Sequence, residues 1–452
     1  MSELPFQLVI YRAPSKNNTE SLLCINLLRT VPGRRAVYDA LWNQRSVIAK
    51  VFSHRLSAKR HLKREWKGLN NLAHRKLNSP EPLFYGRTEN GQWVAVAEKI
   101  AESSSALDVF TQLQENPAEQ LALLILVGRE LADQHIRGVL QKDLHLGNYL
   151  LTNDKIYTLD AGQIRFLPGE VSKKKSIAQL AMLAAWLPDR QKETVTKLCM
   201  EYFKVRDWRF GKSDEILFQK ELSSYLKRAI SKGLKKTLRT SKRHVKIRHK
   251  QCVAVFDRNF CLDAKSTDFI EQVDALMDSG EILKDGNTCY VSRLTWNGRT
   301  VVVKRYNHKG FIHSLRQTIL RSRARRCWLH GHRLGILNIA TPKPLAYIER
   351  RKGLLIWKSY LITEYVEGQK LYHFLRDKSI SEKQRSDIIR RMNHILEEMG
   401  KNRMTHGDLK HTNILITKNG PVLTDLDAMR VHKWNFSYRI RRAKDLERIK
   451  WE

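Results

Sequence analysis

Two short stretches of the chain carry acidic and amide residues at the same spacing. In each, an aspartate is followed by an asparagine five residues later and by a second aspartate seventeen residues later: Asp143, Asn148 and Asp160, then Asp408, Asn413 and Asp425. An aspartate can orient or deprotonate a hydroxyl, while an amide oxygen and a second carboxylate can hold Mg²⁺ on ATP. The pattern indicates phosphoryl transfer to a hydroxyl, with Asp143 and Asp408 as catalytic residues and the other four as metal ligands.

Other anchors repeat in the same order upstream of these stretches. Trp42 lies eight residues before Lys50, and Trp296 lies eight before Lys304. A proline follows a tryptophan by fourteen residues in both places: Trp66 to Pro80, then Trp328 to Pro342. Self-similarity over several ordered anchors predicts two copies of one domain.

Residues upstream of each catalytic stretch predict a nucleotide site. Val47–Lys50 is an apolar strand ending in a lysine that would grip the α- and β-phosphates of ATP, as Lys304 would in the second copy. Glu65, in a helical stretch, is placed to pair with Lys50. A glycine turn precedes each lysine, by seventeen residues at Gly33 and by eighteen at Gly286, and would cover the phosphates. Strands ending near Glu98 and Glu364 would lead into the segments that bind adenine.

Composition limits the classes of function. The net charge of +36 is larger than solubility requires and predicts a polyanionic partner. No nucleic-acid-binding signature accompanies the charge, so nucleic acid is the less favoured partner and an anionic membrane surface the more favoured. The six cysteines form no C-x-x-C pair, the first residues do not resemble a signal peptide, and the apolar runs are too short to span a bilayer. We therefore expect a cytoplasmic protein that binds peripherally to a membrane.

A basic segment separates the two predicted copies. Residues 227–250 contain eleven lysines and arginines and no acidic residue, and apolar side chains recur at helical spacing at Leu226, Ile230, Leu234 and Leu238. This pattern predicts a basic amphipathic helix on an anionic surface, with a solvated linker as the alternative. The expected domains are residues 1–250, which include this basic helical tail, and residues 251–452, which have a short C-terminal lobe.

These motifs together resemble the lipopolysaccharide kinase family, whose members phosphorylate heptose or Kdo in the lipopolysaccharide inner core. The resemblance covers most of the chain except roughly residues 185–280, and it depends on nine segments: Val47–Lys50, Arg64–Trp66, Gln141–Asn148, Asp160, Val301–Lys304, Arg326–Trp328, Thr341–Pro342, His406–Asn413 and Asp425–Asp427. It implies an α+β fold of two tandem bilobal protein-kinase-like domains. It also implies ATP and Mg²⁺ as cofactors, a lipid A-core glycolipid as substrate and a place at the inner membrane.

The chain departs from the protein-kinase pattern in several positions. Lys142 and Gly407 stand where an arginine usually precedes the catalytic aspartate, and neither metal aspartate is followed by Phe-Gly or by A-P-E. Cys327 aligns with Glu65, so the second copy is expected to lack an orienting partner for its lysine and to be the weaker or more specialised catalyst. A protein Ser/Thr/Tyr kinase and a nucleotide- or lipid-binding scaffold without turnover remain as alternatives.

Overall fold

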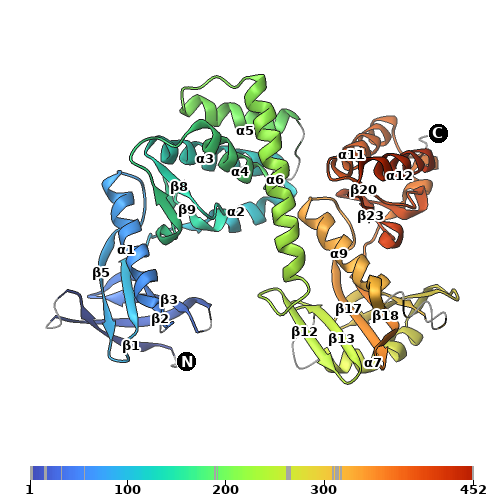
Figure 1. The fold of residues 1–452 in the computed structure, drawn as a ribbon, viewed down its shortest axis with the longest axis horizontal. Coiled ribbons are helices and arrows are strands. Elements are labelled where there is room, and N and C mark those ends of the chain that lie inside the picture. Colours follow the sequence, from blue (N-terminus) through green and yellow to red (C-terminus); the bar gives the residue numbers. More distant parts are fainter. Residues whose placement is uncertain are drawn as a thin grey trace. The chain divides into compact units, whose positions relative to one another are not determined.

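The computed structural model describes residues 4–14, 18–31, 33–54, 56–187, 190, 192–260, 266–307, 310, 315 and 318–449. Contacts divide the chain into two compact units, Met1–Leu222 and Ser223–Glu452 (Figure 1). Each unit combines a large antiparallel sheet with a mainly helical part, so both are α+β. No helix in the described part of the chain has the length and apolarity that a bilayer span needs.

The first unit begins with a closed barrel, in the order β1-β2-β3-β4-β6-β5. Its strands are β1 (Phe6–Arg12), β2 (Thr19–Val31), β3 (Arg35–Trp42), β4 (Arg45–Phe52), β5 (Pro82–Thr88) and β6 (Trp93–Glu98). Val47, Ala49 and Val51 alternate along β4 and point into the barrel core. The intervening residues of β4 therefore face outward, where helix α1 (Ala58–His74) follows; this alternation places the side chain of Lys50 on the same side as α1.

The rest of the first unit is mainly helical. Its elements are β7 (Ser104–Ser105), α2 (Ala106–Gln112), α3 (Pro117–Ile136), β8 (Val139–Gln141), β9 (Tyr149–Leu151), β10 (Ile156–Thr158), β11 (Ile164–Phe166), α4 (Lys173–Ala184), α5 (Lys192–Val205) and the first part of α6 (Lys212–Lys236). Asn116 followed by Pro117 predicts the start of α3, and Gly138 predicts its end. The start is confirmed, because the Asn116 side chain accepts a hydrogen bond from the Glu119 amide at 3.3 Å. Its predicted end near Gly138 is also confirmed, since Gly138 has a φ of +69° just after the helix.

The second unit begins with a seven-stranded sheet in the order β12-β13-β17-β18-β16-β15-β14. Its elements are β12 (His244–His249), β13 (Cys252–Asp257), α7 (Ser266–Asp278), β14 (Glu281–Lys284), β15 (Cys289–Trp296), β16 (Arg299–Tyr306), α9 (Arg323–Ile336), β17 (Pro344–Lys352) and β18 (Leu355–Glu364). The order β15-β16-β18-β17 is the same as β3-β4-β6-β5 in the first unit. Asn297-Gly298 between two alternating strands predicts a hairpin. The structure confirms it, since both residues have positive φ and Trp296 pairs with Arg299 across the turn.

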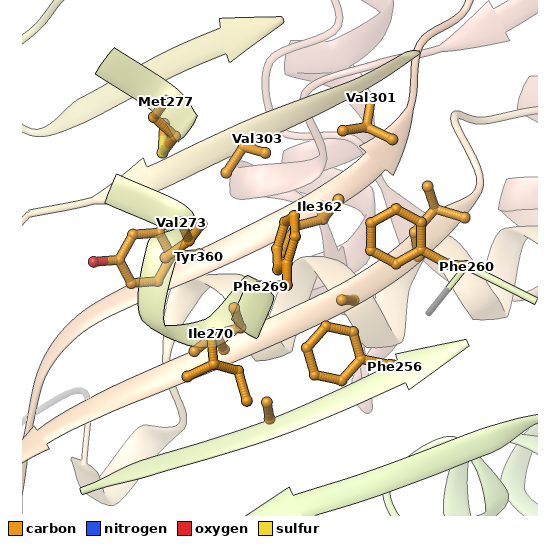
Figure 2. Close-up of a cluster of buried hydrophobic side chains, with 14 of the residues drawn as sticks. Phe256, Phe260, Phe269, Ile270, Val273, Met277, Val301, Val303, Tyr360 and Ile362 are labelled. Carbon is orange, nitrogen blue, oxygen red and sulfur yellow. The ribbon is translucent and has the colours of Figure 1, made fainter. Parts of the chain in front are cut away.

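Helix α7 covers the face of this open sheet. Its apolar side chains, which include Phe269, Ile270 and Val273, pack against Val303 and Tyr360 on the strands (Figure 2). The sheet of the first unit instead closes on itself and buries its own inner face. The two units therefore protect the same kind of apolar face in different ways.

We expect Phe269→Ala to destabilise the second unit by about 3–5 kcal/mol, because the phenyl ring is fully buried and its removal leaves a cavity. Urea unfolding of the full chain, followed by tryptophan fluorescence, measures the change. Leu354→Ala is the matched control, since Leu354 is 84% exposed. Equal losses in the two variants would contradict the packing described for α7.

The second unit ends in a smaller lobe. Its elements are β19 (Gln369–Lys370), α10 (Leu371–Arg376), α11 (Glu382–Lys401), β20 (Met404–Thr405), β21 (Ile414–Thr417), β22 (Gly420–Leu423), β23 (Arg430–Val431) and α12 (Asn435–Arg448). Ile388, Met392 and Met399 recur at helical spacing, which predicts a core-facing stripe on α11, and all three are buried. Gly400 predicts the end of this helix but lies inside it. A Cβ there would lie 2.5 Å from a guanidinium nitrogen of Arg442, so the glycine leaves room for the Arg442 side chain.

The basic segment, residues 227–250, is not the single amphipathic helix that its sequence predicts. Helix α6 ends at Lys236, and strand β12 occupies residues 244–249. Leu234 and Leu238 pack against the buried Trp328 of α9, whose Nε1 donates a hydrogen bond to the Thr237 carbonyl at 3.1 Å. Part of the apolar stripe is therefore core of the second unit, Ser223–Glu452. The eleven basic side chains of residues 227–250 are all exposed.

Candidate functional site

In the first unit the structure brings Lys50, Glu65 and Asp160 together. The Lys50 ammonium contacts the Glu65 carboxylate and lies 3.6 Å from Asp160 Oδ1. Glu65, on α1, also accepts a hydrogen bond at 3.2 Å from the Gly162 amide. Burial alone would lower the pKa of Lys50, but the charges of Glu65 and Asp160 outweigh it and raise that pKa. The lysine is therefore held as a fixed cation.

Hydrogen bonds to backbone carbonyls fix the predicted catalytic stretch of the first unit. The Asn148 side-chain amide donates to the Asp143 carbonyl at 2.9 Å, and the Leu159 amide donates to the Asn148 carbonyl at 2.7 Å. Asp160 then adopts a left-handed backbone conformation, with φ 52° and ψ 46°. Such a conformation costs free energy for a residue with a side chain, and residues held in it occur in turns and cluster at active sites. The Asp143 carboxylate is exposed.

The second unit has the same connections at matching positions. The Asn413 side-chain amide donates to the Asp408 carbonyl at 2.9 Å, and the Thr424 amide donates to the Asn413 carbonyl at 2.9 Å. Asp425 has φ 53° and ψ 66°, again left-handed. The predicted metal and catalytic residues of each unit are therefore gathered in one local arrangement, which the two units share.

Asp408 has charged neighbours. Its Oδ1 lies 3.0 Å from Lys410 Nζ and 3.6 Å from an Arg448 guanidinium nitrogen. Burial acts to raise the pKa of Asp408, but the hydrogen bond and charge of Lys410 outweigh it and hold that pKa below the usual range. His145 is the residue two after the first-unit aspartate, so Lys410 is specific to the second unit. The sequence analysis missed Lys410, although the Asp-Leu-Lys spacing made it visible.

Lys304 has an orienting carboxylate after all. Its ammonium lies 2.7 Å from Asp425 and 2.9 Å from Asp427. Asp427 also accepts hydrogen bonds from Tyr306 at 2.5 Å and from the Cys327 thiol at 3.1 Å. Burial opposes ionisation of Asp427, but the charge of Lys304 prevails and lowers its pKa. The expectation that Lys304 lacks a partner is therefore wrong, because Asp427 supplies the carboxylate from the opposite side.

Side-chain size explains why the carboxylate that pairs with the lysine has a different position in each unit. In the first unit a Cβ on Gly162 would lie 3.0 Å from Glu65 Oε2, so a glycine leaves room for the glutamate. The second unit places the smaller Cys327 on the helix and Asp427 two residues after the metal aspartate, the position that Gly162 has in the first unit. Tyr306, two residues after Lys304, donates to Asp427, whereas the matching residue of the first unit is a phenylalanine. The units therefore differ together at these three positions. The carboxylate that pairs with the lysine lies on the helix in the first unit and on the loop in the second.

Each site opens into a cavity with an apolar wall. The cavity of the first unit is about 320 Å³ and that of the second about 360 Å³. Matching apolar side chains line both: Val37, Ile48, Ala95 and Leu150 in the first, and Val291, Val302, Leu361 and Leu415 in the second. The predicted hinge residues Glu98 and Glu364 also line them. Each cavity therefore combines a surface suited to a flat ring with a lysine and two or more acidic groups.

The two predicted phosphate-covering glycines do not line these cavities. Gly33 has a φ of +66°, and nothing lies within 4 Å of where its Cβ would be. The neighbouring Arg29 and Arg35 line the first cavity instead, and Arg35 lies 3.7 Å from Asp160. Lys284 replaces them in the second cavity, just before Gly286. Basic side chains beside the turns, which the sequence analysis did not select, therefore line the cavities in place of the glycines.

The residues at each site suit Mg²⁺ bound together with phosphate. The Asn148 and Asn413 side chains donate through nitrogen to the backbone, which leaves their amide oxygens to face a cation. Each unit adds one carboxylate, Asp160 or Asp425. No group of three or more His, Cys, Asp or Glu in the described residues could hold a metal ion alone. Phosphate oxygens would complete the coordination, as is usual for Mg²⁺ on nucleotides.

Comparison with known families finds a similarity for most of the second unit. Residues 270–452 match the model of the Lipopolysaccharide kinase (Kdo/WaaP) family, a range that runs from within α7 through α12 and includes Lys304, Asp408, Asn413 and Asp425. No curated protein matches the chain. The family match makes lipopolysaccharide kinase activity the activity to test for this part of the chain.

Proposed function

We propose that this protein transfers the γ-phosphoryl group of ATP to a hydroxyl of heptose or Kdo in the lipopolysaccharide inner core, at the cytoplasmic face of the inner membrane. The match of residues 270–452 to the lipopolysaccharide kinase family supports the reaction class. We further propose that both units are kinase-like domains and that both are catalytic. The observation that carries this is the shared arrangement of a lysine, a partner carboxylate, an asparagine and two aspartates in each unit.

The mechanism follows from the chemistry of these groups. The apolar wall would hold the adenine ring, and Lys50 or Lys304 would contact the α- and β-phosphates. Mg²⁺ on Asn148 and Asp160, or on Asn413 and Asp425, would neutralise charge on the phosphates. Asp143 or Asp408 would orient the sugar hydroxyl and accept its proton as the oxygen bonds to the γ-phosphorus and ADP leaves. Lys410 stands where it can stabilise negative charge near Asp408.

The direct test is mass spectrometry of core oligosaccharide from cells with and without this protein. We expect a loss of one or more phosphate groups when the protein is absent, and their return when it is supplied. Purified protein with γ-labelled ATP and dephosphorylated core should transfer the label to sugar. Label on protein Ser, Thr or Tyr, with none on sugar, would favour the protein-kinase alternative.

We also expect the protein to bind anionic vesicles and to release them as salt rises. The eleven exposed basic residues of 227–250 motivate this prediction. Each contributes about 1 kcal/mol near an anionic surface, so engaging a third of them gives roughly 4 kcal/mol. Leu234 and Leu238 are partly buried against the core of the second unit, so charge must supply most of the energy of vesicle binding. Co-sedimentation at low and high salt measures it, and equal binding to neutral vesicles would contradict it.

A further inference from the structure

A second cavity in the second unit has a different character from the nucleotide cavity. It is about 550 Å³ and lies between α6, α9 and the strands β20 and β23. Leu329 and Arg333 of α9 line this cavity, whereas Cys327 and Gly331 of the same helix line the nucleotide cavity. Residues two apart on a helix point to opposite faces, so α9 separates two distinct sites.

The charged lining residues of this second cavity are all basic. They are Lys227, Lys235, Arg321, Arg333, Lys401 and Arg403, with His432 beside them, and no aspartate or glutamate lines it among the described residues. Lys401 is paired with Glu398 at 2.7 Å. Cations gathered without acidic residues between them repel one another, and an anion placed among them would relieve that repulsion.

Arg333 is the lining cation whose surroundings most favour an anionic ligand. It is partly buried, and burial lowers its pKa. Its guanidinium lies 3.4 Å from His330 Nδ1, and no carboxylate in the described part of the chain pairs with it. The pKa of His330 is lowered to about 3 by burial and by Arg333, so that imidazole stays neutral and supplies no negative charge. A desolvated guanidinium is costly unless an anion pairs with it.

The remaining wall of the cavity is apolar. Ile230, Leu234 and Leu238 line it from α6 and the residues after it, Leu329 lines it from α9, and Met404 and Val431 line it from the strands. A free phosphate or a sugar phosphate would leave this surface without a partner. A ligand that carries an anionic group and a hydrocarbon chain would satisfy both parts of the cavity.

We propose that this cavity binds one phosphorylated lipid, with the phosphate near Arg333 and Lys235 and the acyl chain along Leu234 and Leu329. This binding is separate from phosphotransfer and does not require it. Met404 lies four residues before Asp408, so the bound lipid would contact the strand that leads into the catalytic stretch. The ligand could come from membrane phospholipid or from the acylated, phosphorylated end of a glycolipid.

The test uses the full chain and short-chain phosphatidic acid below its micellar concentration, with calorimetry as the measurement. Lengthening the acyl chains from four to eight carbons should strengthen binding by about fourfold for each methylene that becomes buried. Inorganic phosphate and dioctanoylglycerol are the separate parts of this ligand, and each should bind at least tenfold more weakly. Equal binding of phosphate and phosphatidic acid would overturn the proposal.

Two substitutions locate the site. Lys235→Gln and Arg333→Gln should each weaken binding of dioctanoyl phosphatidic acid about tenfold or more, as expected for loss of a charge-assisted hydrogen bond. Lys232→Gln is the matched control, because Lys232 is an exposed lysine of α6 that does not line the cavity. Equal effects at Lys232 and Lys235 would mean diffuse adsorption and would overturn the site. Short-chain phospholipid and lipid A are then compared as competitors of dioctanoyl phosphatidic acid. The stronger competitor indicates which of the two sources supplies the ligand.

Discussion

Replacing Asp143 and Asp408 together with asparagine is expected to abolish phosphotransfer, while each single change removes the activity of its own unit. Loss of a positioned general base typically costs about 10²- to 10⁴-fold in rate. The amide keeps the size of the carboxylate, and neither side chain is buried in a core, so the fold should remain intact. Initial rates of ATP turnover with core oligosaccharide as acceptor measure the effect in the single and double variants.

Matched controls separate this effect from a general loss of charge. Asp154→Asn serves the first unit and Asp278→Asn serves the second, since both aspartates are exposed and lie outside the cavities. If Asp408→Asn alone removes all turnover and Asp143→Asn changes nothing, the first unit is a catalytically inert partner. That outcome would also overturn the sequence-based expectation that the second copy is the weaker catalyst.

Local spacing was the most informative signal in the sequence. It located the lysine strands, the Asn297-Gly298 hairpin and the aspartate–asparagine stretches, because each depends on residues close together in the chain. The role of Asp427 was not visible in the same way. Cys327 and Asp427 are a hundred residues apart, and only folding reveals that the thiol and the carboxylate meet. Cys327, in place of a helix glutamate, removes one partner of Lys304, and Asp427 from a distant part of the chain supplies another.

The basic segment shows a second limit of sequence reasoning. Helical spacing of apolar residues predicts an apolar face but does not say what covers it. Here Trp328 covers Leu234 and Leu238, so a face that matched a membrane-binding helix is partly protein core. The strand at residues 244–249 was also missed: Lys246 and Arg248 alternate there with Val245 and Ile247, but the charge dominated the pattern. Pairing with β13 decides that structure.

The lysine pairs with a helix carboxylate in the first unit and with a loop carboxylate in the second, and this difference leads to a prediction for the second unit. Asp427→Gly should raise the KM for ATP about 10- to 100-fold, because Lys304 loses a charge-assisted contact of about 1.5–3 kcal/mol. Cys327→Glu alone should also impair the unit, since it places a second carboxylate beside Asp427 and the two would repel. Kinetics are measured in an Asp143→Asn background, so that only the second unit turns over.

The double variant Cys327→Glu/Asp427→Gly should recover most of this loss. It recreates the arrangement of the first unit, where Glu65 reaches the lysine and the glycine leaves room for it. Residues in direct contact commonly show coupling energies of 0.5–3 kcal/mol in such cycles, so the recovery should be well above additivity. Adding Tyr306→Phe removes the donor that Asp427 no longer needs and should not reverse the rescue. The rise in melting temperature on adding ATP gives a second readout that does not depend on turnover. A double variant no better than the sum of its single changes would show that Asp427 does more than replace the helix glutamate.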